Sequence, residues 1–200
     1  AAVIRLPHIS NFTDFMPLEQ HELLGVRYVQ RAQELGRPDL VILPGTKNTM
    51  EDLLWLRQNG LEAAALKLAH AGTPILGVCG GYQMLGQTLD DPQGTESGRP
   101  MALSGLGLLP TRTVFDAQKR RMQVRAAAQG ELFGGARLTG YEIHNGRTEV
   151  GGAPFCVLED GTPEGCVNRN VFGTYLHGLF DSGELTGALV RRLCARKGIS

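Results

Sequence analysis

The chain has 200 residues, and its 20 basic and 20 acidic side chains balance to a formal net charge of zero. This length suits one large domain or two small ones, and a chain of this size can bury a hydrophobic core without disulfides or structural metals. The balanced charge gives no electrostatic signature of nucleic-acid or membrane-surface binding. No apolar run approaches the roughly 20 residues that span a bilayer, and no signal peptide opens the sequence. The four cysteines form no CxxC pair, so we expect no metal site and a reduced, cytoplasmic protein.

The first half of the sequence alternates short β-rich runs with helical patterns. The predicted strands are residues 1–6, 25–30, 39–44 and 74–79. Leucines at helical spacing predict two helices over residues 49–72, with Gly60 as the break between them. Residues 82–89 predict another short helix. This alternation indicates an α/β fold with a mostly parallel central sheet, flanked by helices on both faces.

The second half changes to short strand-like runs separated by glycine-rich turns. These runs are residues 107–115, 121–129, 139–148, 155–159, 165–170 and 171–178. They predict additional antiparallel strands, appended to the sheet, in the C-terminal half. A final helix is expected over residues 183–198, with basic residues near its C-terminal end as the helix dipole favours. Residues 90–100, DDPQGTESGRP, are expected to form a mobile loop, and residues 1–200 to form a single domain.

Cys79 lies in the segment GVCGG, with Gly77 two residues before it and Gly81 two residues after it. A strand that ends in a nucleophile flanked in this way is the strand–nucleophile–helix elbow, best known in its serine form G-x-S-x-G. The N-terminus of the following helix favours a thiolate over a thiol. The N–H of Gly80 would point at a developing oxyanion, and one such donor is worth ~3 kcal/mol of barrier. This segment by itself is equally compatible with a buried structural cysteine at a strand end.

A cysteine nucleophile needs a base, and the chain has five histidines. Three have polar neighbours and are expected at the surface: His8, His21 and His70. His177 ends an apolar run and precedes a glycine, so its side chain could project into a cleft. His144, in GYEIHNG, is the alternative at another strand end. The combination with a distant cysteine favours His177 over a satisfied, partly buried histidine.

The segment VILPGTKNT contains a strand, Gly45, Lys47 and the start of a helix, which is similar to a phosphate loop. The P-loop requires G-x-x-x-x-G-K-[ST], and a single glycine precedes this lysine by two positions, so the segment is not an ATP site. The turn at Gly45 would expose a backbone N–H beside the strand that carries Cys79. It is therefore a candidate second oxyanion donor, and a plain strand-to-helix turn is the alternative.

GVCGGYQMLG and the distal GTYLHG resemble the nucleophile and histidine segments of class I glutamine amidotransferases, whose pattern is G-x-C-x-G-x-Q. The segments RLPHISNFTDFMPLE, LPGTKNT, GYEIHNGRT and GTYLHGLFD more closely resemble the C-terminal glutaminase domain of the cobyric acid synthase family, in the same order. The resemblance implies that Cys79 and His177 are catalytic and that Gly45 and Gly80 hold the oxyanion. It also implies substrate-binding roles for Gln83, Tyr141 and His144.

One position departs from the wider class. Class I enzymes usually carry a glutamate two residues after the histidine, and Leu179 occupies that position here. The cobyric acid synthase branch resembles this sequence in lacking the glutamate, so a Cys–His dyad is expected, with Glu142 as a candidate third group.

The resemblance implies glutamine hydrolysis that supplies ammonia for ATP-dependent amidation of adenosylcobyrinic acid a,c-diamide to adenosylcobyric acid, in cobalamin biosynthesis. It implies no cofactor in this domain. ATP, Mg²⁺ and the corrinoid would bind an N-terminal synthetase domain that precedes Ala1 in a longer chain. No nucleic-acid or membrane partner is expected. The alternatives are the glutaminase of a lipid II amidating enzyme or of cobyrinic acid a,c-diamide synthase, and a non-catalytic interaction module.

Overall fold

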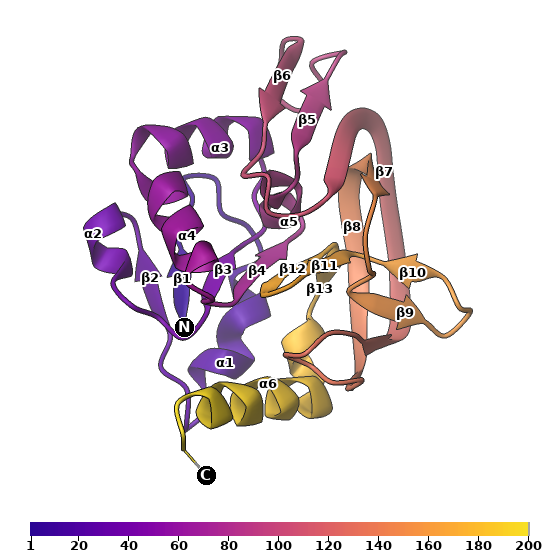
Figure 1. The fold of residues 1–200 in the computed structure, drawn as a ribbon. Coiled ribbons are helices and arrows are strands. Elements are labelled where there is room, and N and C mark those ends of the chain that lie inside the picture. Colours follow the sequence, from indigo (N-terminus) through magenta and orange to yellow (C-terminus); the bar gives the residue numbers. More distant parts are fainter. Residues whose placement is uncertain (200) are drawn as a thin grey trace.

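A six-stranded sheet lies at the centre of the computed structural model, which describes residues 1–199 (Figure 1). Its strand order is β11-β12-β4-β3-β1-β2, and every neighbouring pair is parallel except β11 with β12. Its strands are β1 (Ala2–Ile4), β2 (Arg27–Val29), β3 (Val41–Leu43), β4 (Ile75–Val78), β11 (Cys166–Asn168) and β12 (Val171–Thr174). The four strands predicted in the first half are therefore confirmed.

Helices cover both faces of this sheet (Figure 1). One face packs against α2 (Ala32–Leu35), α3 (Thr49–Gln58), α4 (Leu61–His70) and α5 (Gly80–Leu85). The other face packs against α1 (Met16–Glu19) and α6 (Gly183–Arg196), with the short 3₁₀ turns η1 (Phe12–Phe15) and η2 (Leu179–Asp181). Gly60 separates α3 from α4 in a left-handed conformation with φ 74°, as its position in the sequence predicted. No helix within residues 1–199 is long and apolar enough to cross a membrane.

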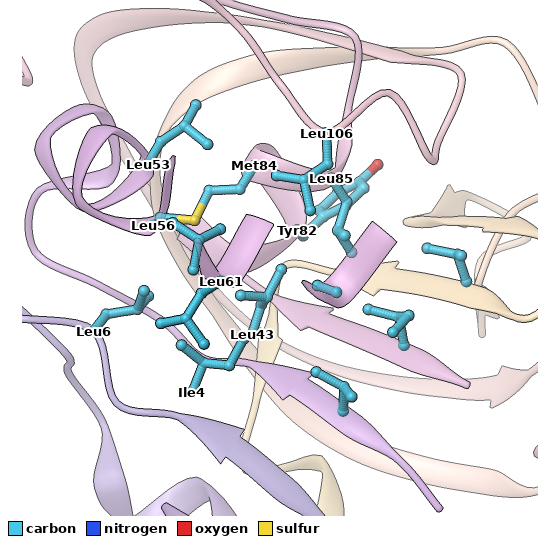
Figure 2. Packing of buried hydrophobic residues seen from close by; sticks show 14 of the residues in the cluster. Ile4, Leu6, Leu43, Leu53, Leu56, Leu61, Tyr82, Met84, Leu85 and Leu106 are labelled. Atoms are coloured by element: carbon cyan, nitrogen blue, oxygen red, sulfur yellow. The ribbon is translucent and has the colours of Figure 1, made fainter. Parts of the chain in front are cut away.

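Side-chain alternation along the strands divides the core between the two faces. Ile4 and Leu43 point to one face, where Figure 2 shows them beside leucines from α3 and α4. Val3 points to the opposite face, toward α1 and α6. Each fully buried side chain of this size contributes about 1.5–3 kcal/mol relative to an exposed one. The two apolar layers fix the sheet, and therefore the ends of its strands, in one position.

A second sheet is built around a long antiparallel ribbon of β7 (Thr111–Ala128) and β8 (Arg137–Val150). Its shorter strands are β5 (Thr88–Asp91), β6 (Met101–Ser104), β9 (Cys156–Leu158), β10 (Pro163–Glu164) and β13 (Leu176–His177). Of the strands in the second half, only β11 and β12 extend the first sheet, and β12 joins β4 in parallel, so β11 alone is the expected antiparallel addition to that sheet. Of the others, β5 and β9 pair with β7 and β13 pairs with β8, while β6 pairs with β5 and β10 pairs with β9. The strands next to the ribbon supply the partners that its backbone groups need.

The segment after Cys79 differs from its prediction at its end. The helix α5 stops at Leu85, and Gly86 is extended. Thr88 and Leu89, predicted to be helical, instead belong to β5 and pair with both β6 and β7. Pairing with a strand on each side stabilises the extended conformation by more than the local helical preference of these residues.

Residues 90–100 are expected to form a mobile loop, but Asp90 and Asp91 belong to β5, and the buried carboxylate of Asp91 anchors the residues that follow. This carboxylate accepts five hydrogen bonds, from the backbone N–H groups of Thr95, Glu96 and Ser97 and from the hydroxyls of Thr95 and Ser97. Burial alone would raise the pKa of Asp91, but these hydrogen bonds, led by those from Ser97, outweigh it and lower the pKa. The loop is therefore ordered around a single charge and carries Glu96 to a defined place.

Candidate active site

Three adjacent strands of the first sheet end at the same place. Gly45 follows β3, Cys79 follows β4, and His177 follows β12 after the chain crosses into β13 of the second sheet. The spatial order β12-β4-β3 brings these residues together although 132 positions (177 minus 45) separate the outer two in sequence. Ligands of open parallel sheets bind at the carboxyl ends of the strands. The structure therefore places the predicted residues at the edge where a site is expected.

Cys79 has the strained backbone of a nucleophile elbow, with φ 52° and ψ −110°. Such a conformation costs a residue other than glycine on the order of 1–3 kcal/mol and persists where the surroundings impose it. The flanking glycines let the turn pack tightly. A Cβ on Gly81 would overlap the carbonyl oxygen of Leu43, and one on Gly77 would lie 2.6 Å from Cδ1 of Leu85. The glycines are required because helix and strand leave no room for side chains.

The four cysteines differ in environment, and no two are joined by a disulfide. Burial raises the pKa of Cys166 to about 11, and burial together with Glu164 raises that of Cys156 further. Both therefore stay thiols at neutral pH. Cys79 is only partly buried, lies at the N-terminus of α5, and has its Sγ 3.5 Å from the carbonyl oxygen of Ile143. Among these three cysteines, Cys79 is the one that is partly exposed and lines a cavity, where a substrate could reach its sulfur.

The imidazole of His177 is held by a buried carboxylate from the opposite end of the chain. Its Nδ1 lies 2.7 Å from Oδ2 of Asp14 in η1, and the backbone N–H of Gly178 donates to Oδ1 of the same carboxylate at 2.9 Å. Both side chains are almost completely buried. Burial alone would lower the pKa of His177, but the hydrogen bond with Asp14 and the neighbouring Cys79 thiol outweigh it and raise the pKa to about 9.

This contact corrects the expected dyad, because a third group does orient the histidine. It is Asp14, and the sequence reasoning missed it. Glu142, the candidate named from the sequence, lies on β8 and pairs with His144, whose Nε2 is 2.5 Å from its Oε1. The only local signal for Asp14 is an acidic residue between Phe12 and Phe15 in a short apolar stretch. That pattern does not identify a partner 163 residues away.

The two predicted oxyanion donors lie close to Cys79, since Gly80 follows it in the chain and Gly45 packs against its Cβ. No hydrogen bond from the backbone N–H of Gly45 or Gly80 is found among residues 1–199. A Cβ on Gly45 would lie 3.2 Å from Cε1 of His177 and 3.7 Å from Cβ of Cys79. The backbone at Gly45 is thus packed against both catalytic candidates, and its N–H and that of Gly80 can donate to a substrate.

A cavity of about 370 Å³ opens over Cys79 and His177, which is within the usual size range of small-molecule sites. Of the predicted substrate-binding residues, Gln83 and His144 line it. Tyr141 does not: its ring packs on His177 at a centroid distance of 5.5 Å, outside the cavity lining. The sequence reasoning missed one acidic and three basic residues of the lining, which are Glu96, Lys47, Lys119 and Arg121.

Gln83 and His144 are tied into the walls of the cavity. The Gln83 amide donates to the carbonyl of Asn145 at 3.2 Å and to the hydroxyl of Tyr175 at 3.1 Å, and it accepts from the hydroxyl of Thr49 at 3.2 Å. The ring of His144 stacks on Tyr175 with centroids 3.6 Å apart. These contacts hold α5, α3 and β8 around the site, so the protein's own side chains fix the walls.

Residues 1–185 match the family model of the CobB/CobQ-like glutamine amidotransferase domain. The cobyric acid synthases of Moorella thermoacetica and Salmonella arizonae are 45% and 47% identical to the chain over 99% and 100% of its length. The chain spans only 41% of the length of each of these relatives. A chain in the structure of PurLQS from Thermotoga maritima shares the fold, with a TM-score of 0.72 at 19% identity over 96% of this chain and 97% of its own length. The resemblance inferred from the motifs is confirmed, and the chain belongs to the CobB/CobQ-like glutamine amidotransferase domain family.

Proposed function

We propose that the chain hydrolyses glutamine and that the ammonia amidates carboxylates of a corrinoid, as the names of the cobyric acid synthase relatives suggest. The observation that carries the proposal is the strained Cys79 elbow in one cavity with the Asp14–His177 pair. Nucleophile, base and orienting carboxylate then have the roles of a catalytic triad.

The reaction would begin with attack of the Cys79 thiolate on the side-chain amide carbon of glutamine. The negative charge would develop on the amide oxygen, between the N–H groups of Gly45 and Gly80. Because Asp14 holds Nδ1 of His177, Nε2 carries the mobile proton and would protonate the departing ammonia. The same nitrogen would then take a proton from the water that attacks the thioester. Glutamate would leave, and the thiolate would be restored.

The remaining charges of the cavity suit the other end of the substrate. Free glutamine carries an ammonium and a carboxylate on its α-carbon. Glu96 is the carboxylate that would face the ammonium, while Lys47, Lys119 and Arg121 would face the α-carboxylate. Glu96 is already positioned, because its Oε1 accepts from the N–H of Thr49 at 2.7 Å. Burial raises the pKa of Glu96, and a bound ammonium would favour its charged form.

The ATP-dependent step would belong to the region that the relatives have in addition to the matched segment. ATP and Mg²⁺ would be bound there, since the only loop here that is similar to a phosphate site lacks the required glycine spacing. Ammonia made at Cys79 would have to reach an activated carboxylate in that region.

Glutamine-dependent and ammonia-dependent amidation of the corrinoid, measured on a protein that joins this chain to its synthetase region, test the proposal. Cys79→Ser should abolish the glutamine-dependent reaction and leave the ammonia-dependent one, because free ammonia bypasses the glutaminase. A glutamine-like diazoketone should label Cys79 in preference to the other three cysteines. Glutamine use by the variant at the rate of the unmodified protein would refute the assignment. Amidation of a lipid II stem peptide or of cobyrinic acid instead would favour the related enzymes.

A further inference from the structure

A fully buried carboxylate on α3 joins two loops that border the catalytic cavity. Asp52 has no solvent exposure. Its Oδ1 lies 2.7 Å from Nδ1 of His8, and its Oδ2 accepts from the backbone N–H of His8 at 3.1 Å and from the hydroxyl of Thr46 at 2.5 Å. This one carboxylate on α3 is therefore hydrogen-bonded to groups of the loop after β1 and of the loop after β3.

Both loops carry groups of the proposed site. Gly45, the oxyanion donor, directly precedes Thr46. The methyl of Thr46 lies against Gly80, the other donor, since a Cβ on Gly80 would be 2.5 Å from Cγ2. The loops also bind each other, because the N–H of Ser10 donates to the carbonyl of Gly45 at 2.9 Å. A shift of the loop after β3 would therefore move Gly45 relative to Cys79.

The charge of Asp52 makes this arrangement specific. A buried carboxylate is costly unless several donors satisfy it, and only the observed placement of both loops supplies all three. The hydrogen bond with Asp52 raises the pKa of His8, and the carboxylate of Glu51, 3.7 Å from Nε2, adds to the effect. His8, expected from the sequence to be an ordinary surface residue, has a partly exposed ring with one edge bound to a buried anion.

We propose that Asp52 is a positioning residue of the glutaminase, which holds the N–H of Gly45 at the oxyanion position through Thr46 and His8. The proposal rests on the glutaminase function proposed above. It concerns an interaction made with the tetrahedral intermediate and not with bound glutamine, so its loss lowers kcat and leaves KM nearly unchanged. A misplacement of ~1 Å near the reacting atoms costs about a hundredfold in rate.

The test compares Asp52→Asn with Glu51→Gln, a change on the same helix at an exposed carboxylate that also faces His8. Asp52→Asn should lower kcat about 10- to 100-fold, with KM within about twofold. Its affinity for glutamate γ-semialdehyde, which forms a tetrahedral adduct on Cys79, should fall by the same factor. Alkylation of Cys79 by iodoacetamide develops no oxyanion and should keep its rate. Glu51→Gln should match the unmodified protein in all of these measurements.

Thr46→Val removes the hydroxyl that donates to Asp52 and accepts from the N–H of Asn48, and it decides the question if Asp52→Asn does not fold. This variant should lower kcat and aldehyde affinity by a smaller factor than Asp52→Asn, with KM and the alkylation rate unchanged. Thr46→Ser, which keeps the hydroxyl, should restore kcat. Equal losses of turnover, aldehyde affinity and alkylation would indicate general disruption of the site and overturn the proposal, as would no loss at all. If instead the unmodified protein neither hydrolyses glutamine nor binds the aldehyde at Cys79, the proposed function itself fails.

Discussion

Asp14 sets both the orientation and the ionisation of His177. Its bond to Nδ1 prevents the ring from flipping and leaves Nε2 for proton transfer. With a pKa of about 9, the imidazole is protonated at neutral pH, which suits a partner thiolate and a departing ammonia. The carboxylate reaches His177 from η1, so a residue at the start of the chain tunes the chemistry near its end.

We expect Asp14→Asn to lower kcat at least about 100-fold and to bring the pKa of His177 down from about 9 toward its ordinary value. NMR titration of the imidazole measures the pKa directly. Because the folded-state pKa lies above the unfolded one, the pair stabilises the protein fully below about pH 6.5, and this contribution is lost as the pH rises through 9. The stability difference between the two proteins should therefore shrink over that window. Glu142→Gln is the control, and a shift of the His177 titration by that variant would contradict the assignment.

The two histidines at the cavity should respond differently to replacement. His177→Ala should reduce kcat severely, because it removes the proton carrier. His144→Ala should mainly raise KM, because it removes a wall that stacks on Tyr175. Steady-state kinetics on both variants decide the matter, and a larger loss of kcat for His144→Ala would show that the base is misassigned.

At the scale of elements, the turn from β4 to α5 is tightly constrained by its surroundings. It forces Cys79 into a strained conformation with positive φ and places Gly81 against the backbone of β3. Because the obstruction is backbone, it cannot move aside as a flexible side chain would. The elbow at Cys79 therefore packs directly on the end of β3, which leads into the loop that contains Gly45.

Gly81→Ala should therefore destabilise the protein by several kcal/mol, at the upper end of single substitutions. Gly183→Ala is a matched control at the start of α6, since a methyl group added there would meet nothing within 4 Å. That change should be neutral or stabilising by about 0.5–1 kcal/mol. Urea unfolding of both variants provides the comparison. Similar stability of the two would mean that β3 and α5 are not packed as tightly as described.

The loop after β5 is an element of a different kind, because hydrogen bonds to one carboxylate order it. We expect Asp91→Asn to raise the KM for glutamine severalfold with little change in kcat, since the loop carries Glu96 toward the substrate and not toward the reacting atoms. Glu96→Gln should have the same effect on KM without loss of thermal stability. A fall in kcat at constant KM for Asp91→Asn would place the loop in the chemistry instead.

On the scale of the whole molecule, the site lies where the two sheets meet. Gly45 and Cys79 come from the first sheet, while His177 has crossed into β13 of the second and pairs there with Tyr141 of β8. A shift of the β7–β8 ribbon would thus act directly on the base. The chain spans 41% of the length of the Moorella thermoacetica relative, and docking of the additional region that such a relative has could produce this shift.

We therefore expect the chain alone to be a poor glutaminase, stimulated when a synthetase region with ATP and corrinoid is joined to it. Unregulated hydrolysis would waste glutamine, and a displacement of ~1 Å of a donor or base is enough for about a hundredfold effect. Glutaminase assays on the isolated chain and on the longer protein measure the difference. Equal kcat/KM in both, unaffected by ATP and corrinoid, would rule out this coupling and leave the Cys79–His177 chemistry intact.

Several features could be predicted from local sequence because their causes are local. Alternation of strands and helices predicted the parallel sheet, Gly60 predicted the break between α3 and α4, and the glycines around Cys79 predicted its elbow. In each case the residue type and its immediate neighbours fix the backbone conformation. The motif match also supplied His177, which the structure brings into the same cavity as Cys79.

Other features were decided only by tertiary structure. Asp14 pairs with His177, and Asp52 binds His8 and Thr46. The strands β7 and β8 form the centre of a second sheet. These contacts join segments that are distant in the sequence. An aspartate in a sequence has no preferred partner until folding excludes water from it. Burial then makes an unpaired carboxylate costly, and the partner is whichever donor the packed strands bring within reach. The sequence by itself determined where the chain turns and that Cys79 lies at the elbow between β4 and α5. The tertiary packing decided which charged side chains pair around it, namely Asp14 with His177 and Asp52 with His8.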